Sequence, residues 1–328
     1  MHEGALHQSS RGLFRSAVVS NVPLCREHYR LTLRVDEFPP TLPGQFVQVA
    51  CNDDPTNFDA AEIEWAEPGN ATATTGMPRL TGAEILGRTP VLRRPFSLAG
   101  RRDFVDGSVE LDLIHRIVGA GTEWLSKLEP AQEVNLVGPL GNSFPLPPTG
   151  STALLIGGGV GIPPMIYLAS RLATTGHTAV AFAGALTRDL MSLTLEVDSK
   201  GDTVASEFDR HGFKAILSTD DGSLGYRGYV TQALEQWLDA NDKPGGSTPP
   251  PTLYTCGPEP MMKRVADIAQ TRGLTAHIAV ERAMACGMGT CQSCVIKLRD
   301  TTSPSPDAWR YRLACTDGPV FTATDLRW

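Results

Sequence analysis

Four cysteines near the end of the sequence have a spacing that can hold an inorganic cluster. Cys286, Cys291 and Cys294 follow the pattern Cys-x4-Cys-x2-Cys, and Cys315 comes after twenty further residues. This is the ligand spacing of plant-type 2Fe–2S clusters, which are held by four thiolates. A structural zinc site is the alternative, but four-cysteine zinc sites usually carry paired Cys-x2–4-Cys knuckles. The spacing therefore favours a protein that transfers single electrons.

The residues between the first cysteines suit a loop that wraps closely around such a cluster. Gly287 and Gly289 can adopt positive φ and turn backbone N–H groups toward sulfur. Hydrogen bonds of this kind help to set the reduction potential of a cluster. Disulfides are a weaker alternative, because Cys25, Cys51 and Cys256 leave an odd remainder that suits a reducing cytoplasm.

Composition and charge narrow the class of protein. The 328 residues exceed one average domain and predict two or three. The net charge is −7 and no Lys/Arg run is present, which argues against nucleic acid or anionic lipid as a partner. No apolar run reaches the roughly 18 residues that span a membrane, and the first ten residues lack a signal-peptide core. We therefore expect a cytoplasmic protein with no membrane partner.

Residues 1–148 have the pattern of an antiparallel β-barrel with one helix, expected over 123–128. Residues 52–90 interrupt this pattern with seven acidic and two basic residues, and predict a long acidic surface insertion. Period-2 alternation and turn signals predict short strands over residues 15–22, 29–35, 45–49, 92–98, 109–117 and 134–137.

Two stretches of this barrel suit a bound diphosphate. Arg93 and Arg94 lie in an apolar strand, where unpaired burial is costly, and guanidinium groups bind phosphate oxygens well. Pro95 stiffens the turn and Ser97 offers a hydroxyl, although a solvated edge strand explains the same residues. The glycine-rich turn at 119–122 feeds a helix, whose first N–H groups face an anion.

Residues 149–274 alternate strands and helices, which predicts a doubly wound parallel sheet. Apolar runs predict buried strands over 152–156, 179–183, 214–218 and 253–256. In such sheets ligands bind beyond the carboxyl ends of the strands. Two turns lie there, and both contain glycine: Gly157-Gly158-Gly159-Val160-Gly161 and Cys256-Gly257-Pro258.

Neither turn identifies its ligand alone. The first departs from the G-x-G-x-x-G fingerprint because residue 162 is Ile, but it still brings backbone close to a pyrophosphate. Cys256 is either a small buried filler or a thiol beside a nicotinamide ring. NAD is favoured over NADP, because the only cation after the second strand, Arg188, is followed by Asp189.

Taken together, these motifs resemble a known family. Arg94-Pro95-Phe96-Ser97, Gly121-Thr122 and the two sheet turns are similar to the ferredoxin–NADP⁺ reductase superfamily. The segments 219–223, 281–294 and 314–321 resemble more narrowly the electron-transfer subunits of class 1B dihydroorotate dehydrogenase, the PyrK family. The resemblance covers residues 15–51 and 91–328. It implies an FAD-binding barrel (1–148), an NAD-binding α/β domain (149–274) and a small 2Fe–2S domain (275–328).

The resemblance also implies roles for residues. The FAD would be held by Arg94, Pro95, Phe96, Ser97, Ile114, His115, Arg116, Gly121 and Thr122. The NAD would lie against Gly157, Gly158, Gly159, Gly161, Cys256, Gly257 and Pro258. Cys286, Cys291, Cys294 and Cys315 would ligate the cluster. His115 is interpreted as a wall residue beside the flavin, because hydride transfer needs no protein proton relay. The sequence departs from the family in the 52–90 insertion and in a longer gap before Cys315.

The activity implied is a redox relay. Electrons would leave dihydroorotate through the FMN of a partner, cross the cluster to FAD and reduce NAD⁺. The implied partner is an FMN-containing dihydroorotate dehydrogenase catalytic subunit of pyrimidine biosynthesis, with two copies of each chain. Related subunits for ferredoxin:NADP⁺ transhydrogenation or sulfide oxidation are alternatives within the superfamily. A non-catalytic zinc-binding or interaction protein is the alternative of a different class.

Overall fold

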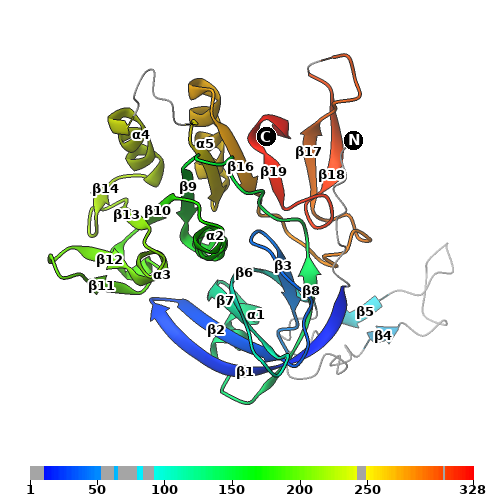
Figure 1. Ribbon diagram of the computed structural model, residues 1–328. Helices are drawn as coiled ribbons and strands as arrows, with labels where there is room; N and C mark the ends of the chain where they lie inside the picture. The colour runs from blue at the N-terminus through cyan, green and yellow to red at the C-terminus, as the bar shows by residue number, and fades with distance from the viewer. Residues whose placement is uncertain (1–10, 53–62, 66–79, 84–91, 242–248, 306) are drawn as a thin grey trace.

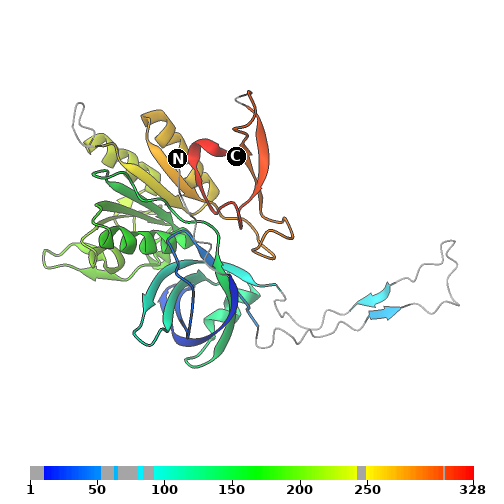
Figure 2. The ribbon, with the colours of Figure 1, turned by 45° about the vertical axis from the view of Figure 1, so that its right-hand side comes forward.

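The computed structural model describes the chain except for residues 1–10, 53–62, 66–79, 84–91, 242–248 and 306. Its elements form a barrel, a large mixed sheet with helices and a small C-terminal sheet (Figure 1). Figure 2 shows the closed barrel below the large sheet, with the C-terminal strands standing beside both. This architecture confirms the predicted multidomain fold of a β-barrel, an α/β sheet and a small C-terminal domain.

The barrel is antiparallel and closed by six strands in the order β1-β2-β7-β6-β3-β8. In β2 the leucines Leu31 and Leu33 are fully buried inside the barrel, while Arg30 and Arg34 form ion pairs with Glu207 and Glu110. This is the predicted period-2 alternation. The strands are β1 (Gly12–Cys25), β2 (His28–Val35), β3 (Phe46–Val49), β6 (Arg94–Asp103), β7 (Val109–Arg116) and β8 (Glu133–Leu140). The barrel helix α1 (Ala120–Ser126) starts three residues before the predicted range.

Most of the predicted acidic insertion at 52–90 lies outside the described residues. Within it, β4 (Ile63–Trp65) and β5 (Leu80–Ala83) pair as a two-stranded antiparallel sheet.

The large sheet has seven strands in the order β14-β13-β10-β9-β15-β16-β19, and its first six strands are mutually parallel. The strands are β9 (Ala153–Gly158), β10 (Ala179–Ala185), β13 (Lys214–Thr219), β14 (Tyr226–Arg227), β15 (Thr252–Cys256), β16 (Thr275–Ala279) and β19 (Val320–Thr322). The short strands β11 (Leu195–Val197) and β12 (Thr203–Ala205) form a separate hairpin.

Helices cover both faces of this sheet, as expected of a doubly wound fold. Along β9, Leu155 packs into the core that contains α2, whereas Leu154 and Ile156 pack into the core that contains α4 and α5. This explains the continuous apolar run of the sequence, since both faces of the strand are buried. The helices are α2 (Ile162–Thr174), α3 (Ser206–Asp209), α4 (Val230–Asn241) and α5 (Glu259–Arg272).

Contacts between the large sheet and the barrel fix their arrangement. Helix α2 lies against β6, between sheet and barrel (Figure 1). The Tyr167 hydroxyl donates to the Thr41 carbonyl at 2.9 Å, and Arg30 pairs with the buried Glu207 of α3 at 2.7 Å. The two units are therefore held by buried polar contacts as well as by apolar packing.

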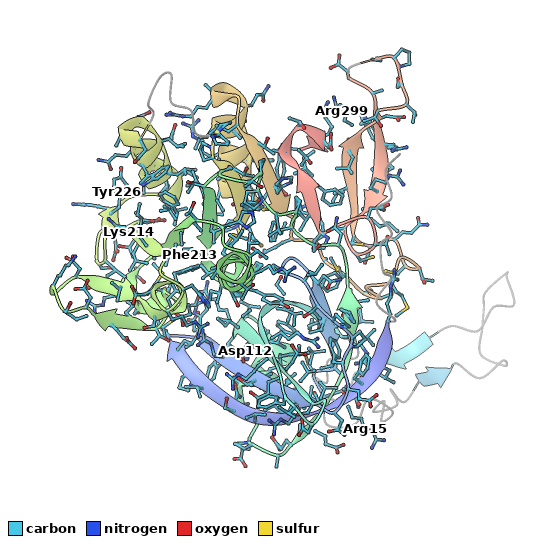
Figure 3. All side chains as sticks on the ribbon, viewed as in Figure 1. Arg15, Asp112, Phe213, Lys214, Tyr226 and Arg299 are labelled. Atoms are coloured by element: carbon cyan, nitrogen blue, oxygen red, sulfur yellow. The ribbon has the colours of Figure 1, made fainter. Side chains whose placement is uncertain are left out.

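The C-terminal segment was not resolved into elements by sequence reasoning. It forms an antiparallel sheet of three strands: β17 (Val295–Arg299), β18 (Trp309–Leu313) and β20 (Leu326–Arg327). Figure 3 shows Arg299 at the end of β17 that is remote from the barrel. The chain returns between them to add β19, antiparallel, to β16 of the large sheet. Because β16 and β19 both lie in residues 275–328, that predicted domain shares a sheet with its neighbour. The domain boundaries stay a prediction.

No helix in the described part of the chain combines the length and the apolar character needed to cross a membrane.

Candidate cofactor cleft and cysteine loop

A cleft of about 860 Å³ lies where the barrel, the large sheet and the segment after β16 meet. Its walls come from β6, β7 and the start of α1 on the barrel side, and from Val160, Pro163 and Cys256 on the sheet side. Residues 279–284 close the third side. The volume falls in the range of small-molecule and cofactor sites.

All nine predicted FAD positions line this cleft: Arg94, Pro95, Phe96, Ser97, Ile114, His115, Arg116, Gly121 and Thr122. They come from three elements that are separate in sequence, and the barrel brings them together. Their contact with FAD stays a prediction.

The cleft opens because two neighbouring barrel strands separate. Strand β6 pairs with β7 only from Leu98 onward, so residues 94–97 pair with β3 alone. Residues 114–116 of β7 pair with β2 alone. Pro95 has no N–H, so its place on the open edge leaves no ladder bond unmade. The free edges of both strands thus offer backbone groups to a ligand.

The adjacent arginines point to different partners. Arg93 donates to the Asn135 carbonyl at 2.9 Å, and burial lowers the pKa of its guanidinium. Arg94 donates to the Leu92 carbonyl at 2.8 Å and lines the cleft. The other cleft arginines, Arg116 and Arg282, form ion pairs, whereas Arg94 forms none with a described carboxylate. Among the three arginines of the cleft, Arg94 is therefore the one whose positive charge can bind an anionic ligand.

Thr122 and Gly121 are placed at the start of α1. The Thr122 hydroxyl accepts from the N–H groups of Val118 and Gly119 at 2.9 and 3.2 Å. A Cβ on Gly121 would lie 3.6 Å from Arg94 Cγ and 3.3 Å from Cys51 Cβ. Gly121 therefore lets α1 pack closely against the stem of Arg94.

His115 is a buried, neutral ring in the cleft wall. It stacks on Tyr29 with ring centroids 5.8 Å apart, and Phe96 meets it edge-on. Desolvation, with a smaller contribution from His28, lowers the pKa of His115 to about 4. Neither ring nitrogen has a hydrogen-bond partner among the described residues. This arrangement suits the predicted wall role and gives no sign of a proton relay.

On the sheet side, one of the residues predicted to contact NAD lines the cleft, namely Cys256. Its thiol is buried, and desolvation raises its pKa well above the ordinary value. A protonated thiol at this position is small and uncharged.

The two sheet turns pack against each other at the carboxyl ends of β9 and β15. A Cβ on Gly161 would lie 2.1 Å from the Cys256 carbonyl oxygen, and one on Gly257 would lie 2.8 Å from the Gly158 oxygen. Both glycines are thus required by backbone contact between the turns. Gly159, with φ +53°, has no atom within 4 Å of a Cβ position and faces open space. The predicted NAD positions Gly157, Gly158, Gly159, Gly161, Gly257 and Pro258 lie beside the cleft without lining it.

Sequence reasoning did not include residues 281–284 in the cleft. Glu281 lies near Cys256, and desolvation by the cleft walls raises the pKa of its carboxyl although solvent reaches the residue. Their position in the chain could have indicated that they line the cleft, because they follow the parallel strand β16 and ligands bind beyond the carboxyl ends of parallel strands. That strand was not predicted, so the rule had no strand to act on.

The segment that leaves the cleft runs directly into the cysteine loop. Cys286 Sγ accepts the N–H groups of Met288 and Cys291, both at 3.4 Å. Gly287 and Gly289 have φ of +70° and +92°, which confirms the predicted positive φ at both positions. The Ser293 hydroxyl lies 3.2 Å from Cys291 Sγ, and hydrogen bonds from Ser293 and then from Cys286 lower the pKa of the Cys291 thiol to about 6.

The other two cysteines lie at the base of the β17–β18 hairpin. Cys294 precedes β17, Cys315 follows β18, and the Ala314 N–H donates to the Cys294 carbonyl at 3.0 Å. The hairpin therefore absorbs the longer gap before Cys315. Burial and the neighbouring Cys294 thiol raise the pKa of Cys315 to about 12.

The donor set fits an iron–sulfur cluster. The Cys291 N–H donates to Cys286 Sγ, the thiols of Cys294 and Cys315 are hydrogen-bonded to each other, and the nearby Cys286 thiol contributes to the raised pKa of Cys315. All seven cysteines of the chain are free thiols. No group of three or more His, Cys, Asp or Glu side chains among the described residues has the geometry of a metal site. The fit thus rests on the four thiols and on N–H groups directed at sulfur, and the ligand assignment stays a prediction.

Comparison with known proteins matches both halves of this site. Residues 281–327 match the family model described as the iron–sulfur cluster binding domain of dihydroorotate dehydrogenase B, and residues 155–267 match the oxidoreductase NAD-binding domain. A relative named "Dihydroorotate dehydrogenase B (NAD(+)), electron transfer subunit" from Geobacillus thermodenitrificans is 35% identical over 72% of this chain and 80% of its own length. A relative of the same name from Lysinibacillus sphaericus is 30% identical over 93% and 94%.

Solved structures share the fold. An NADH-dependent reduced ferredoxin–NADP oxidoreductase superposes with a TM-score of 0.64 at 21% identity, over 95% of this chain and 90% of that chain. A ferredoxin reductase of carbazole 1,9a-dioxygenase superposes with a TM-score of 0.55 at 20% identity, over 81% and 68%.

Proposed function

Because the chain belongs to the family of dihydroorotate dehydrogenase B electron transfer subunits, we propose that it relays electrons from a dihydroorotate-oxidising partner to NAD⁺. The observation that carries this proposal is that residues 279–284 line the cleft and lead, after one further residue, into Cys286, the first cysteine of the loop. When bound, FAD and a 2Fe–2S cluster supply the exchange between two-electron hydride transfer and single-electron transfer.

The barrel residues of the cleft hold and orient the FAD in this proposal. Arg94, which forms no ion pair with a described carboxylate, would bind a phosphate group with its guanidinium. Phe96 and the neutral His115 would form an uncharged wall against the flavin. The free strand edges at 94–97 and 114–116 would supply backbone hydrogen bonds.

The sheet residues receive the nicotinamide nucleotide. Gly159 faces open space at the carboxyl end of β9, where a pyrophosphate can approach the backbone. Cys256 leaves room for a planar ring in the cleft, since its protonated thiol is small and carries no charge. NAD is preferred to NADP, because Asp189 follows Arg188 and is itself paired with Arg26 at 2.9 Å.

The four cysteines hold the cluster, and the partner docks beside them. Strands β17 and β18 start and end at the buried cysteines and present an exposed face of Lys297, Trp309 and Tyr311. Lys297 lies 4.3 Å above the Trp309 ring, and Trp309 meets Tyr311 at 5.1 Å. Exposed aromatic residues of this kind are typical of protein interfaces. We assign this face to an FMN-containing dihydroorotate dehydrogenase subunit, in an assembly of two copies of each chain in the cytoplasm.

The test is anaerobic purification of the chain alone and with its partner. The lone chain should carry iron and flavin and reduce a dye with NADH, but should oxidise dihydroorotate only after the partner is added. Cys291→Ser should remove the cluster absorption and the coupled activity and retain flavin, with Cys25→Ser as the matched control. Trp309→Ala should weaken only the coupled activity.

Two results would contradict the proposal. One is robust dihydroorotate oxidation by the lone chain. The other is reduction of ferredoxin or oxidation of sulfide without any response to orotate, which would favour the related reductase subunits.

A further inference from the structure

Gln48 is a buried amide without a partner, located between the cleft and the cysteine loop. Its side chain is 0% exposed, and neither Nε2 nor Oε1 has a hydrogen-bond partner among the described residues. A buried polar group without a hydrogen bond loses its solvation free energy with no compensation, so such groups are rare in folded proteins. The position of this amide therefore points to a group that it binds.

The strand pleat directs Gln48 out of the barrel and toward the C-terminal segment. In β3, Val47 and Val49 belong to the barrel core. Phe46 belongs instead to the core that contains Cys294 and Cys315. Since side chains two residues apart share a face of a strand, Gln48 lies on the same side as Phe46.

A close contact joins Gln48 to the cysteine loop. A Cβ on Gly287 would lie 2.8 Å from both Cγ and Nε2 of Gln48, so the amide packs directly on the backbone of Gly287. Gly287 follows Cys286, and the next residue, Met288, donates its N–H to Cys286 Sγ at 3.4 Å. The amide of Gln48 thus packs on the residue that directly follows the first cysteine of the loop.

The flavin side of the strand does not account for the amide. Gln48 pairs with Pro95 across β3 and β6, and Pro95 lines the cleft, as does Phe46. Gln48 itself is not among the cleft residues. Its polar atoms therefore face the cysteine loop rather than the space assigned to FAD.

We propose that the Gln48 amide donates a hydrogen bond to a sulfur of the cluster at Cys286 and so raises the reduction potential of the cluster. An N–H dipole directed at sulfur stabilises the reduced cluster, which carries one more negative charge than the oxidised one. Gln48 is a positioning residue, because it acts on the cluster from the barrel and does not ligate iron. This inference rests on the proposed cluster ligation by the four cysteines.

The experiment measures the potentials of cluster and flavin in one sample. The full chain and its Gln48→Leu variant are loaded with iron, sulfide and FAD, and each is titrated with reductant under spectroscopic and EPR observation. Gln48→Leu should make the cluster about tenfold harder to reduce, which corresponds to about 59 mV for one electron. The flavin potential should not change.

Controls separate this effect from a general disturbance. Gln132→Leu removes another barrel amide, whose Oε1 accepts the Glu129 N–H, and should leave the cluster potential unchanged. If Gln48→Leu does not fold, Gln48→Met keeps the side-chain length and gives the same readout. Fully loaded Gln48 variants with the wild-type cluster potential, or with a shift of the flavin alone, would overturn the inference. A wild-type chain that holds no cluster would overturn the proposed function as well.

Discussion

Asn142 is expected to anchor the C-terminal segment on the barrel, and its removal should loosen the cysteine site specifically. The side chain donates from Nδ2 to the carbonyls of Val320 and Asp317 at 2.8 and 3.2 Å, and its Oδ1 accepts the Val320 N–H at 2.9 Å. These three bonds join the segment just after β8 to Asp317 and to Val320 of β19, two and five residues after Cys315. They therefore link the barrel to the segment that directly follows the fourth cysteine.

The expected magnitude follows from these three bonds. A net hydrogen bond contributes roughly 1 kcal/mol, so Asn142→Ala should reduce the free energy of unfolding by roughly 2–3 kcal/mol. The lower part of that range applies because Asn142 is half-buried, so that water can form some of the hydrogen bonds that the variant loses. Asn142→Asp keeps the acceptor for Val320 N–H but sets a carboxylate oxygen against the two carbonyl oxygens, so its effect should be at least as large.

Hydrogen exchange and urea unfolding together provide the assay. In Asn142→Ala, the Val320 amide and the strands β18 and β19 should exchange faster than in the wild type, and the cluster should be lost sooner to a chelator. Asn21→Ala is the matched control, because Asn21 Nδ2 donates to two barrel carbonyls, those of Leu125 and Leu128, at 2.9 and 3.1 Å. It should lower global stability without selective exchange at β19.

One result would refute this reasoning. If Asn142→Ala and Asn21→Ala lose the same stability and show the same exchange at the C-terminal strands, Asn142 does not anchor that segment.

Two further predictions concern the cleft. Arg94→Ala should weaken FAD binding roughly 10- to 100-fold through loss of a charge-assisted hydrogen bond, as measured by flavin fluorescence. Arg102→Ala, on the same strand as Arg94, breaks an ion pair with Glu110 of β7 and should leave FAD binding unchanged. Burial lowers the pKa of His115 to about 4, so the apoprotein should lose stability as pH falls from about 6.5 toward 4, by about 2 kcal/mol at pH 5. Urea unfolding of His115→Gln should show a smaller difference between pH 7.5 and 5; an unchanged difference would contradict the buried neutral ring.

The sequence predicted the parts of this fold that depend on local patterns. The barrel, sheet-turn and cysteine motifs together led to the predicted family, which the comparisons confirm. The alternation in β2 and the apolar run of β9 correctly predicted a barrel strand and a parallel strand. The glycine turn after β9 was placed at the carboxyl end of its strand for the same reason. Each of these features is encoded within a few neighbouring residues.

What the sequence did not show depends on residues that meet only in the folded chain. Strand β6 continues to Asp103 through Arg101, whose guanidinium is buried because the carbonyls of Phe38 and Pro39 accept from it. No local pattern marks that contact. The return of the chain into β19 and the packing of Gln48 on Gly287 are likewise tertiary, so neither could be predicted from spacing.

The same strands serve both the cleft and the cysteine loop, and this fixes their separation. In β3, Phe46 lines the cleft while Gln48 packs on Gly287, and residues two apart along a strand lie about 7 Å from each other. On the other side, the segment after β16 passes along the cleft and reaches Cys286 within a few residues. In the proposed relay, electrons that pass between the two sites would cross a distance set by strand β3 on one side and by the segment after β16 on the other.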